Sequence, residues 1–241
     1  MRGSVPEAGP ANPIGRIYAE LLRCYGPQGW WPLLDFEGTQ PDKTGSRAGY
    51  HPGRYDLPAT ETQAFEVCVG AILTQNTAWV NVEAALRRLQ DAGALDPDGL
   101  IALEGDRLRE AIRPAGFFNQ KARKVQEFAV FFRNLEGRVP SREALLALWG
   151  IGRETADSML LYAFRVPVFV VDAYTRRIAG TLGLIDPEAD YDEIRALFEQ
   201  NLPRDPAVFQ EYHALLVEHA KRHYRKGSDW SACPLRRIVK E

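Results

Sequence analysis

Two glycines near the middle of the chain stand where backbone groups could contact an anion. Residues 148–152 read LWGIG, and they separate a predicted helix that ends near Ala147 from another that begins near Arg153. Gly150 and Gly152 permit a positive φ and a close approach to the main chain. Such a turn directs N–H groups and the positive end of the second helix outward, which suits a phosphate. A bare Gly-x-Gly is more often an ordinary helical hairpin with a glycine cap, so the surrounding sequence must decide.

Three tryptophans offer flat aromatic faces. Trp30 and Trp31 directly precede Pro32, and Trp79 follows the polar residues 74–77. Large π-faces stack on a base that has been turned out of a duplex, and they attract a cationic ring more than a neutral one. Tryptophans are also mostly buried, so core packing is an equally good interpretation of Trp30 and Trp31.

Composition limits the classes of function. The chain has 241 residues, 45% of them hydrophobic, a formal net charge of −2 and a pI near 6.1. No overall basic field indicates a nucleic-acid partner, so any site for a polyanion must be local. Three widely spaced cysteines indicate a reducing compartment rather than a disulfide framework. Because the sequence shows neither an apolar signal region nor an apolar run of membrane length, we expect a cytoplasmic protein, associated with the nucleoid, without a membrane partner.

The elements that would position these residues are helical. Apolar side chains recur at helical spacing from residue 62 onward, and the run 166–171 is the one strand-like segment, which we interpret as a buried linker to a helix capped by Asp172. Residues 38–60 are rich in Gly, Pro and polar residues and predict a long surface loop, and residues 1–12 predict a disordered tail. The predicted fold class is all-α. The further helical segments are expected at 80–90, 97–104, 106–113, 119–134 and 141–148.

A longer stretch resembles a known family. Residues 148–178 (LWGIGRETADSMLLYAFRVPVFVVDAYTRRI) are similar to the signature of the endonuclease III superfamily of DNA glycosylases, in which a helix-hairpin-helix and a Gly/Pro/Asp loop end in an aspartate. Residues 71–77 (AILTQNT) and 113–122 (RPAGFFNQKA) resemble two more family segments, and the resemblance covers most of residues 62–225.

The resemblance implies two helical domains with the active site in a cleft between them. A six-helix domain at 62–167 would contain the hairpin. A discontinuous helical domain would be formed by 13–61, including the long loop 38–60, together with 168–241. Asp172 would lie where the chain crosses from one domain to the other.

The resemblance also assigns the chemistry to Asp172. Cleaving a base from deoxyribose develops positive charge on the sugar, and a carboxylate can stabilise that charge and orient the attacking water. In bifunctional members a lysine follows the hairpin and attacks the sugar, and Glu154 occupies that position here. A carboxylate cannot form an imine, so the sequence predicts a monofunctional glycosylase. Glu154 is also explained as an acid in the first turn of a helix, where it is favourable toward the dipole.

Several motifs resemble one branch, the bacterial type III 3-methyladenine DNA glycosylases. In that branch, the residues at the positions of Trp31, Pro32 and Trp79 line a pocket for N-alkylated purines, and most of them are aromatic. Trp79 stands where the branch has a phenylalanine, and His219-Ala220-Lys221 resembles a His-Gly-Lys element whose lysine lies near the pocket and can be carbamylated. The implied base-pocket residues are Trp30, Trp31, Pro32, Trp79 and Lys221.

Contacts with double-stranded DNA are implied at two places. Gln75 would fill the gap left by the turned-out nucleotide. The hairpin would contact a phosphate, and the main chain of Leu148, Trp149, Gly150 and Ile151 would hold a monovalent sodium or potassium cation. Seven Lys or Arg residues and one acid lie between Lys221 and Lys240, which suits phosphates or a solvated basic face. The implied DNA-binding residues are Gln75, Asn76, Gly150, Gly152, Arg153 and Thr155.

The carboxyl end predicts the absence of an iron–sulfur cluster. Cluster-bearing relatives end in four cysteine ligands. Here Tyr224 and Trp230 stand at two of those places and only Cys233 remains. We therefore expect a monomeric enzyme without a cofactor, other than the hairpin cation, that removes alkylated purines such as 3-methyladenine. The alternatives are a pyrimidine- or mismatch-specific glycosylase, a lyase that uses another lysine such as Lys221, and a catalytically inactive DNA-binding protein.

Overall fold

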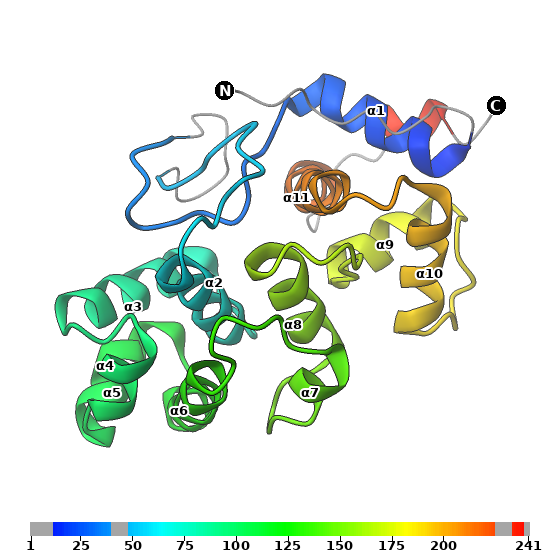
Figure 1. The fold of residues 1–241 in the computed structure, drawn as a ribbon. Helices are drawn as coiled ribbons and strands as arrows, with labels where there is room; N and C mark the ends of the chain where they lie inside the picture. Colours follow the sequence, from blue (N-terminus) through cyan, green and yellow to red (C-terminus); the bar gives the residue numbers. More distant parts are fainter. Residues whose placement is uncertain (1–11, 40–47, 225–232, 239–241) are drawn as a thin grey trace.

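The computed structural model describes residues 12–39, 48–224 and 233–238, and within them the chain is largely helical (Figure 1). Those residues contain no strand, only an isolated bridge between Thr39 and Ala48. The all-α prediction is confirmed. Of the tail predicted at 1–12, residues 1–11 lie outside the described residues, and Asn12 already caps the first helix by accepting the amide of Gly15 at 2.8 Å.

The described α-helices are α1 (Pro13–Tyr25), α2 (Glu61–Leu73), α3 (Trp79–Asp91), α4 (Pro97–Ala102), α5 (Gly105–Ile112), α6 (Phe118–Arg133), α7 (Arg142–Leu146), α8 (Arg153–Ser158), α9 (Ala173–Thr181), α10 (Tyr191–Asn201) and α11 (Pro206–His223). Short turns of other helix types are η1 (Arg113–Ala115), η2 (Met159–Ala163, a π-helix that continues α8) and η4 (Pro234–Arg237).

Side-chain caps begin several of these helices. At the start of α4, Asp96 accepts the amide of Gly99 at 2.9 Å, and at the start of α7, Ser141 accepts the amide of Ala144 at 3.1 Å. Each cap satisfies an amide that the helix itself leaves without a partner. Polar capping residues therefore set where these helices begin. The helix boundaries predicted from the sequence agree with the structure to within a few residues.

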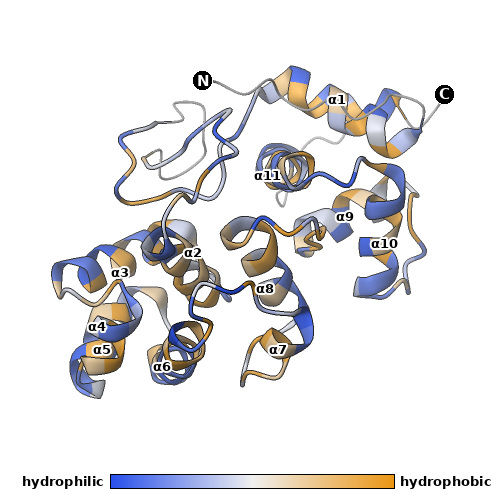
Figure 2. Ribbon diagram, in the orientation of Figure 1, coloured by the Kyte–Doolittle hydropathy of each residue, from blue (hydrophilic) through white to orange (hydrophobic). Residues whose placement is uncertain are grey.

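Two groups of helices lie on either side of α8 and η2 (Figure 1). In the first group, α3 packs against α5, α4 against α6, and α2 against both α3 and α6. In the second, α1 and α9 pack against α11, which is buried along its length from Val208 to Ala220. Figure 2 shows hydrophobic positions concentrated on the faces that these helices turn toward one another. Because η2 contacts both α2 and α11, it bridges the two groups.

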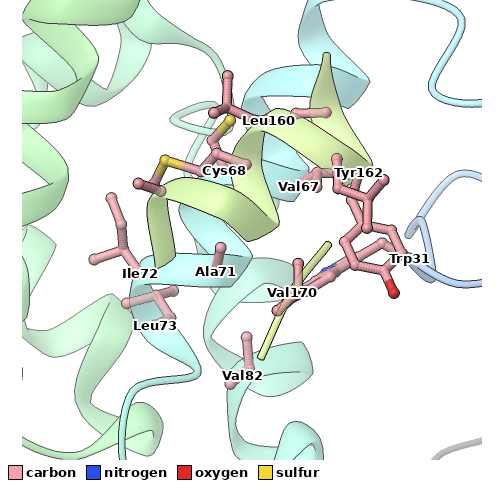
Figure 3. Close-up of a cluster of buried hydrophobic side chains, with 14 of the residues drawn as sticks. Trp31, Val67, Cys68, Ala71, Ile72, Leu73, Val82, Leu160, Tyr162 and Val170 are labelled. Atoms are coloured by element: carbon pink, nitrogen blue, oxygen red, sulfur yellow. The ribbon is translucent and has the colours of Figure 1, made fainter. Parts of the chain in front are cut away.

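A hydrophobic core joins the two groups around η2. Figure 3 shows Trp31 beside Tyr162 of η2, with Val67 and Ala71 of α2 and Val170 around them. Val170 belongs to the run 166–171, which has no strand pairing and is buried from 168 to 171. The buried-linker prediction for this run is confirmed, and the linker ends at Asp172.

The long loop is buried in part, so the prediction of a surface loop at 38–60 is wrong for its second half. Tyr50 is 3% exposed and His51 is 4% exposed. The reason is main-chain pairing: Leu33 donates its amide to Gly49 at 3.0 Å, and His51 donates its amide to Gly29 at 3.1 Å. The segment that carries Trp30 and Trp31 is therefore held against this loop. Residues 40–47 lie outside the described residues.

Candidate active site

Asp172 caps α9 at the end of the buried linker. Its Oδ1 accepts the amide of Thr175 at 2.7 Å, and its side chain is 13% exposed. The N-cap interpretation of Asp172 is thus correct. One oxygen is committed to the cap, and Oδ2 is left for other contacts.

His213 of α11 faces that second oxygen. The distance from His213 Nε2 to Asp172 Oδ2 is 3.5 Å. His213 Nδ1 lies 2.7 Å from the hydroxyl oxygen of Tyr162, which is also 3.1 Å from the carbonyl oxygen of Gln210. Burial alone would raise the pKa of Asp172, but the nearby imidazole of His213 and the hydrogen bond from the amide of Thr175 outweigh burial, so the pKa is lowered. Asp172 is therefore a carboxylate at neutral pH.

Glu154 lies close enough to interact with Asp172. It stands in the first turn of α8 and keeps an exposed surface. Desolvation by the surrounding protein raises the pKa of Glu154, the negative charge of Asp172 raises it further, and His213 lowers it. Glu154 therefore interacts electrostatically with both Asp172 and His213.

The tryptophans gather beside this environment. The ring centroids of Trp31 lie 5.4 Å from Trp79, 5.7 Å from Trp30 and 5.5 Å from Tyr162. Trp30 in turn lies edge-on to His213 at 5.8 Å. The structure therefore brings Trp30, Trp31 and Trp79 together, and His213 connects them to Asp172.

The packing of these rings is dense. Trp31 is 7% exposed, and it lies on Gly70, where an added Cβ would be 3.1 Å from the indole nitrogen. Pro32 is buried as well. A cavity between Pro32 and Trp79 has a volume of about 10 Å³, which is too small for a purine. The core-packing interpretation therefore describes Trp31 in this arrangement.

Lys221 lies over the ring of Trp30. Its Nζ is 6.0 Å from the centroid of the Trp30 ring, within reach of a cation–π contact. Lys221 belongs to the last turn of α11, whereas Trp30 precedes α2 by a long loop. The fold thus places the lysine of the His-Ala-Lys element next to the tryptophans.

The hairpin is tied to the segment after α2. Gln75 donates from Nε2 to the carbonyl of Gly150 at 3.2 Å and to Oγ1 of Thr155 at 3.0 Å. Lys124 of α6 donates to Oε1 of Gln75 at 2.5 Å. Gly150 has a φ of 76°, and a Cβ there would lie 2.3 Å from Cε of Lys124, so any other residue would strain the backbone and displace Lys124. Gly152 has a φ of −90° and is the N-cap of α8, so positive φ is needed at only one of the two glycines.

The comparison with protein families identifies the chain. Residues 69–204 match the model of the HhH-GPD superfamily of base excision DNA repair proteins. The chain is 41% identical over 234 residues to a candidate DNA repair glycosylase of Methanocaldococcus jannaschii, a match that spans 92% of this chain and 94% of that protein. The chain belongs to the HhH-GPD superfamily.

Solved structures agree with this membership. The 3-methyladenine DNA glycosylase of H. pylori, in a crystal structure with bound 1,N6-ethenoadenine, is 30% identical, with a TM-score of 0.59 over 69% of this chain and 91% of that chain. A non-covalent endonuclease III–DNA complex has a TM-score of 0.70 at 21% identity over 93% of this chain and 92% of that chain, which shows the shared fold. The resemblance to the type III branch is confirmed.

Within this HhH-GPD protein, other residues named from the sequence have different surroundings. Asn76 is exposed with a φ of 56°. Arg153 is half exposed, and it pairs with Asp192 at 3.1 Å and with Asp190 at 3.8 Å. The carbonyl of Leu148 accepts the amide of Ile151 at 3.2 Å. Arg153 is therefore shared with acids of α10 and its neighbouring turn.

Asp157 has a role that its local sequence does not indicate. It is fully buried and accepts two hydrogen bonds from Arg142, at 2.7 and 3.0 Å. Arg142 also contacts Asp192 at 3.1 Å. This ion-pair group ties α7, α8 and α10 together and so fixes the second helix of the hairpin.

The carboxyl-terminal aromatic and cysteine residues are also in contact where described. His219 lies between the hydroxyl of Tyr25, at 2.8 Å from Nδ1, and Cys233 Sγ, at 3.3 Å from Nε2. The ring of Tyr224 is 5.7 Å from that of His219. Trp230 lies outside the described residues. Among the described residues, none of the helices combines the length and the hydrophobicity that a membrane span needs.

Proposed function

We propose that this HhH-GPD protein is a monofunctional DNA N-glycosylase that removes alkylated purines such as 3-methyladenine from double-stranded DNA. The observation that carries the proposal is the connected arrangement of Asp172, His213 and Trp30, with Glu154 in the lysine position. It links a carboxylate suited to a cationic sugar with aromatic rings suited to a flat base.

Asp172 would carry the hydrolysis. Loss of the base leaves an oxocarbenium-like sugar, and a fixed carboxylate stabilises that charge and aligns water for attack. The lowered pKa of Asp172, in which His213 and Thr175 outweigh the opposing effect of burial, keeps it ionised at neutral pH. An alkylated purine is already a cation and a good leaving group, so no strong acid on the base is required.

Glu154 supports the absence of lyase chemistry. A lyase of this type needs an amine that attacks the sugar. Glu154 is the group next to Asp172 at the lysine position, and its carboxyl cannot form a Schiff base. Lys221 is the competing amine, because its Nζ lies 6.0 Å from the Trp30 ring.

Trp30, Trp31, Pro32 and Trp79 would select the base, with Lys221 at the edge. A cationic purine gains more from indole faces than a neutral base does. The type III relative of H. pylori was crystallised with 1,N6-ethenoadenine, a modified purine. Because the rings are closely packed, we propose that entry of the base displaces Trp79 from Trp31.

DNA would be held at the hairpin. α8 has no side-chain cap at Gly152, so its first amides are available to a phosphate. A monovalent cation on the hairpin carbonyls would reinforce this contact. Gln75, held by Gly150, Thr155 and Lys124, would occupy the space left by the turned-out nucleotide.

The test is base release from a panel of duplexes that carry methylated purines, oxidised pyrimidines or mismatches, together with borohydride trapping on abasic DNA. Release from methylated purines alone, without a trapped complex, supports the proposal. Release from oxidised pyrimidines or mismatches supports the pyrimidine or mismatch alternative. A trapped complex that Lys221→Ala abolishes supports the lyase alternative, and no release from any duplex supports a DNA-binding role.

A further inference from the structure

His213 occupies an unusual position between the acid and the aromatic rings. Its side chain is 5% exposed, and it comes from α11, far in sequence from both the hairpin and the tryptophans. Its Nε2 is buried, lies 3.5 Å from Asp172 Oδ2, and makes no hydrogen bond within the described residues. A buried polar nitrogen is costly unless it has a partner, and Asp172 is the group it faces.

The groups around Asp172 come from five elements. Glu154 of α8 adds negative charge, and Tyr162 of η2 and Thr175 of α9 are neutral hydroxyl groups. Tyr191 of α10 accepts the amide of Val171 at 3.3 Å. His213 of α11 is the nitrogen donor in this set that faces the second carboxylate oxygen. Because Glu154 adds negative charge near the ionised carboxylate of Asp172, that carboxylate depends on His213 for stabilisation.

The other ring nitrogen determines where the imidazole proton can be. Tyr162 has one hydroxyl proton, and its oxygen lies near both Nδ1 of His213, at 2.7 Å, and the carbonyl of Gln210, at 3.1 Å. If the Tyr162 hydroxyl donates to Nδ1, a neutral imidazole has its single proton on Nε2. If the hydroxyl donates to Gln210 instead, Nδ1 must donate to the hydroxyl oxygen, and the Nε2 of a neutral imidazole would direct a lone pair at Asp172. An ionised Asp172 is compatible with the first arrangement or with a doubly protonated ring, and both put a proton on Nε2.

We propose that His213 is a positioning residue that keeps a proton on Nε2 directed at Asp172 Oδ2, and that Tyr162 holds the ring in place through its contact with Nδ1. The inference rests on the proposed function for the role of Asp172. The N-cap holds Oδ1 and His213 holds Oδ2, so the carboxylate is ionised and fixed in orientation before a damaged nucleotide enters. The edge contact with Trp30 then couples the same imidazole to the base pocket.

The first test needs no activity. The chain has four histidines, so long-range ¹H–¹⁵N spectra of the labelled full chain resolve each ring, and His213→Gln assigns the signal of interest. We expect Nε2 of His213 to carry a proton at neutral pH in wild type. In Asp172→Asn the proton occupancy of this nitrogen should fall. A bare Nε2 in the wild type would overturn the inference, whatever the enzyme's substrate.

The second test is the pH profile of single-turnover base release from methylated DNA. Loss of a close positive or hydrogen-bonding partner raises an aspartate's pKa by roughly 1–3 units, so the acid limb in His213→Leu should move upward by that amount. In His213→Gln, which can still donate an N–H, the acid limb should move upward by less. In Tyr162→Phe the acid limb should also move upward. His219→Gln removes another buried imidazole of α11 and is the matched control, with its acid limb at the wild-type position.

A purely structural role for His213 gives a different profile. In that case the rate falls equally at every pH and the acid limb stays in place, which would refute the inference. If His213→Leu does not fold, His213→Gln and Tyr162→Phe carry the same comparison. Failure of the proposed function is recognised separately, because wild type would then release no base, or Asp172→Asn would release it at the wild-type rate.

Discussion

Glu66 offers a prediction whose size follows from the structure. It lies on α2 and is 2% exposed. Its Oε1 accepts the amide of Leu34, which closely follows Pro32 in the chain, at 2.7 Å. Burial raises the pKa of Glu66 from 4.5 to about 7, and the hydrogen bond from Leu34 opposes this only in part. The perturbation is Glu66→Gln, which removes the ionisable group and keeps an oxygen for Leu34.

The sign follows from proton linkage. The folded state binds the proton of Glu66 more tightly than the unfolded state, so its stabilising contribution is complete below pH 4.5 and is lost as the pH rises through about 7. The full difference corresponds to roughly 3 kcal/mol of unfolding free energy, of which roughly 2–3 kcal/mol falls between pH 5 and pH 8. Wild type should therefore lose stability over this interval relative to Glu66→Gln.

Thermal unfolding at pH 5 and pH 8 measures the effect. The difference in Tm between Glu66→Gln and wild type should be larger at pH 8 than at pH 5 by roughly 5–10 °C. Any cost of the buried amide is the same at both pH values and cancels. Glu61→Gln, at the exposed start of the same helix, is the matched control, because it removes a carboxylate that is not buried. An equal difference at the two pH values would show that Glu66 is not a buried acid in the folded protein.

Three further substitutions test other parts of the site. Glu154→Lys places an amine beside Asp172, so it should create a borohydride-trappable complex on abasic DNA, whereas Glu154→Gln should not; absence of trapping in the lysine variant would contradict the position inferred for residue 154. Asp157→Asn removes the buried charge opposite Arg142, which keeps Asp192 as a partner, so it should cost roughly 1–3 kcal/mol, or roughly 2–10 °C in Tm, and a change within experimental error would refute the role of this ion pair. Gly150→Ala should lower the unfolding free energy by about 1–2 kcal/mol for the left-handed backbone, with a further cost for displacing Lys124. Gly152→Ala, with a negative φ and nothing within 4 Å, should cost less; equal losses of Tm would contradict the hairpin geometry.

Local signals in the sequence predict much of the fold and part of the site. Apolar periods and short capping residues give the helical boundaries, because both act within a few residues. Gly150 and Asp172 are predictable for the same reason, since a tight turn and an N-cap are local requirements. The aromatic cluster of Trp30, Trp31 and Trp79 is predicted through motif resemblance, and the structure brings these rings together.

The sequence does not predict contacts made between distant elements. His213 and Lys124 carry no local motif, and their importance depends on which side chains the fold places opposite them. Asp157 is part of a family motif, but its partner Arg142 is visible only in three dimensions. The burial of the loop before α2 cannot be predicted from its composition, which indicates exposure, because pairing with residues 29–33 buries Tyr50 and His51.

The central claim is that Asp172 performs the base excision, and the most direct measurement is single-turnover release of base from methylated duplex DNA by wild type and Asp172→Asn. Asparagine is also a good N-cap, so α9 and the fold should be retained, which circular dichroism and binding to the same duplex can verify. We expect release by wild type and a loss of roughly 100-fold or more in Asp172→Asn, with binding preserved. Release by Asp172→Asn within a few-fold of wild type would contradict the central claim.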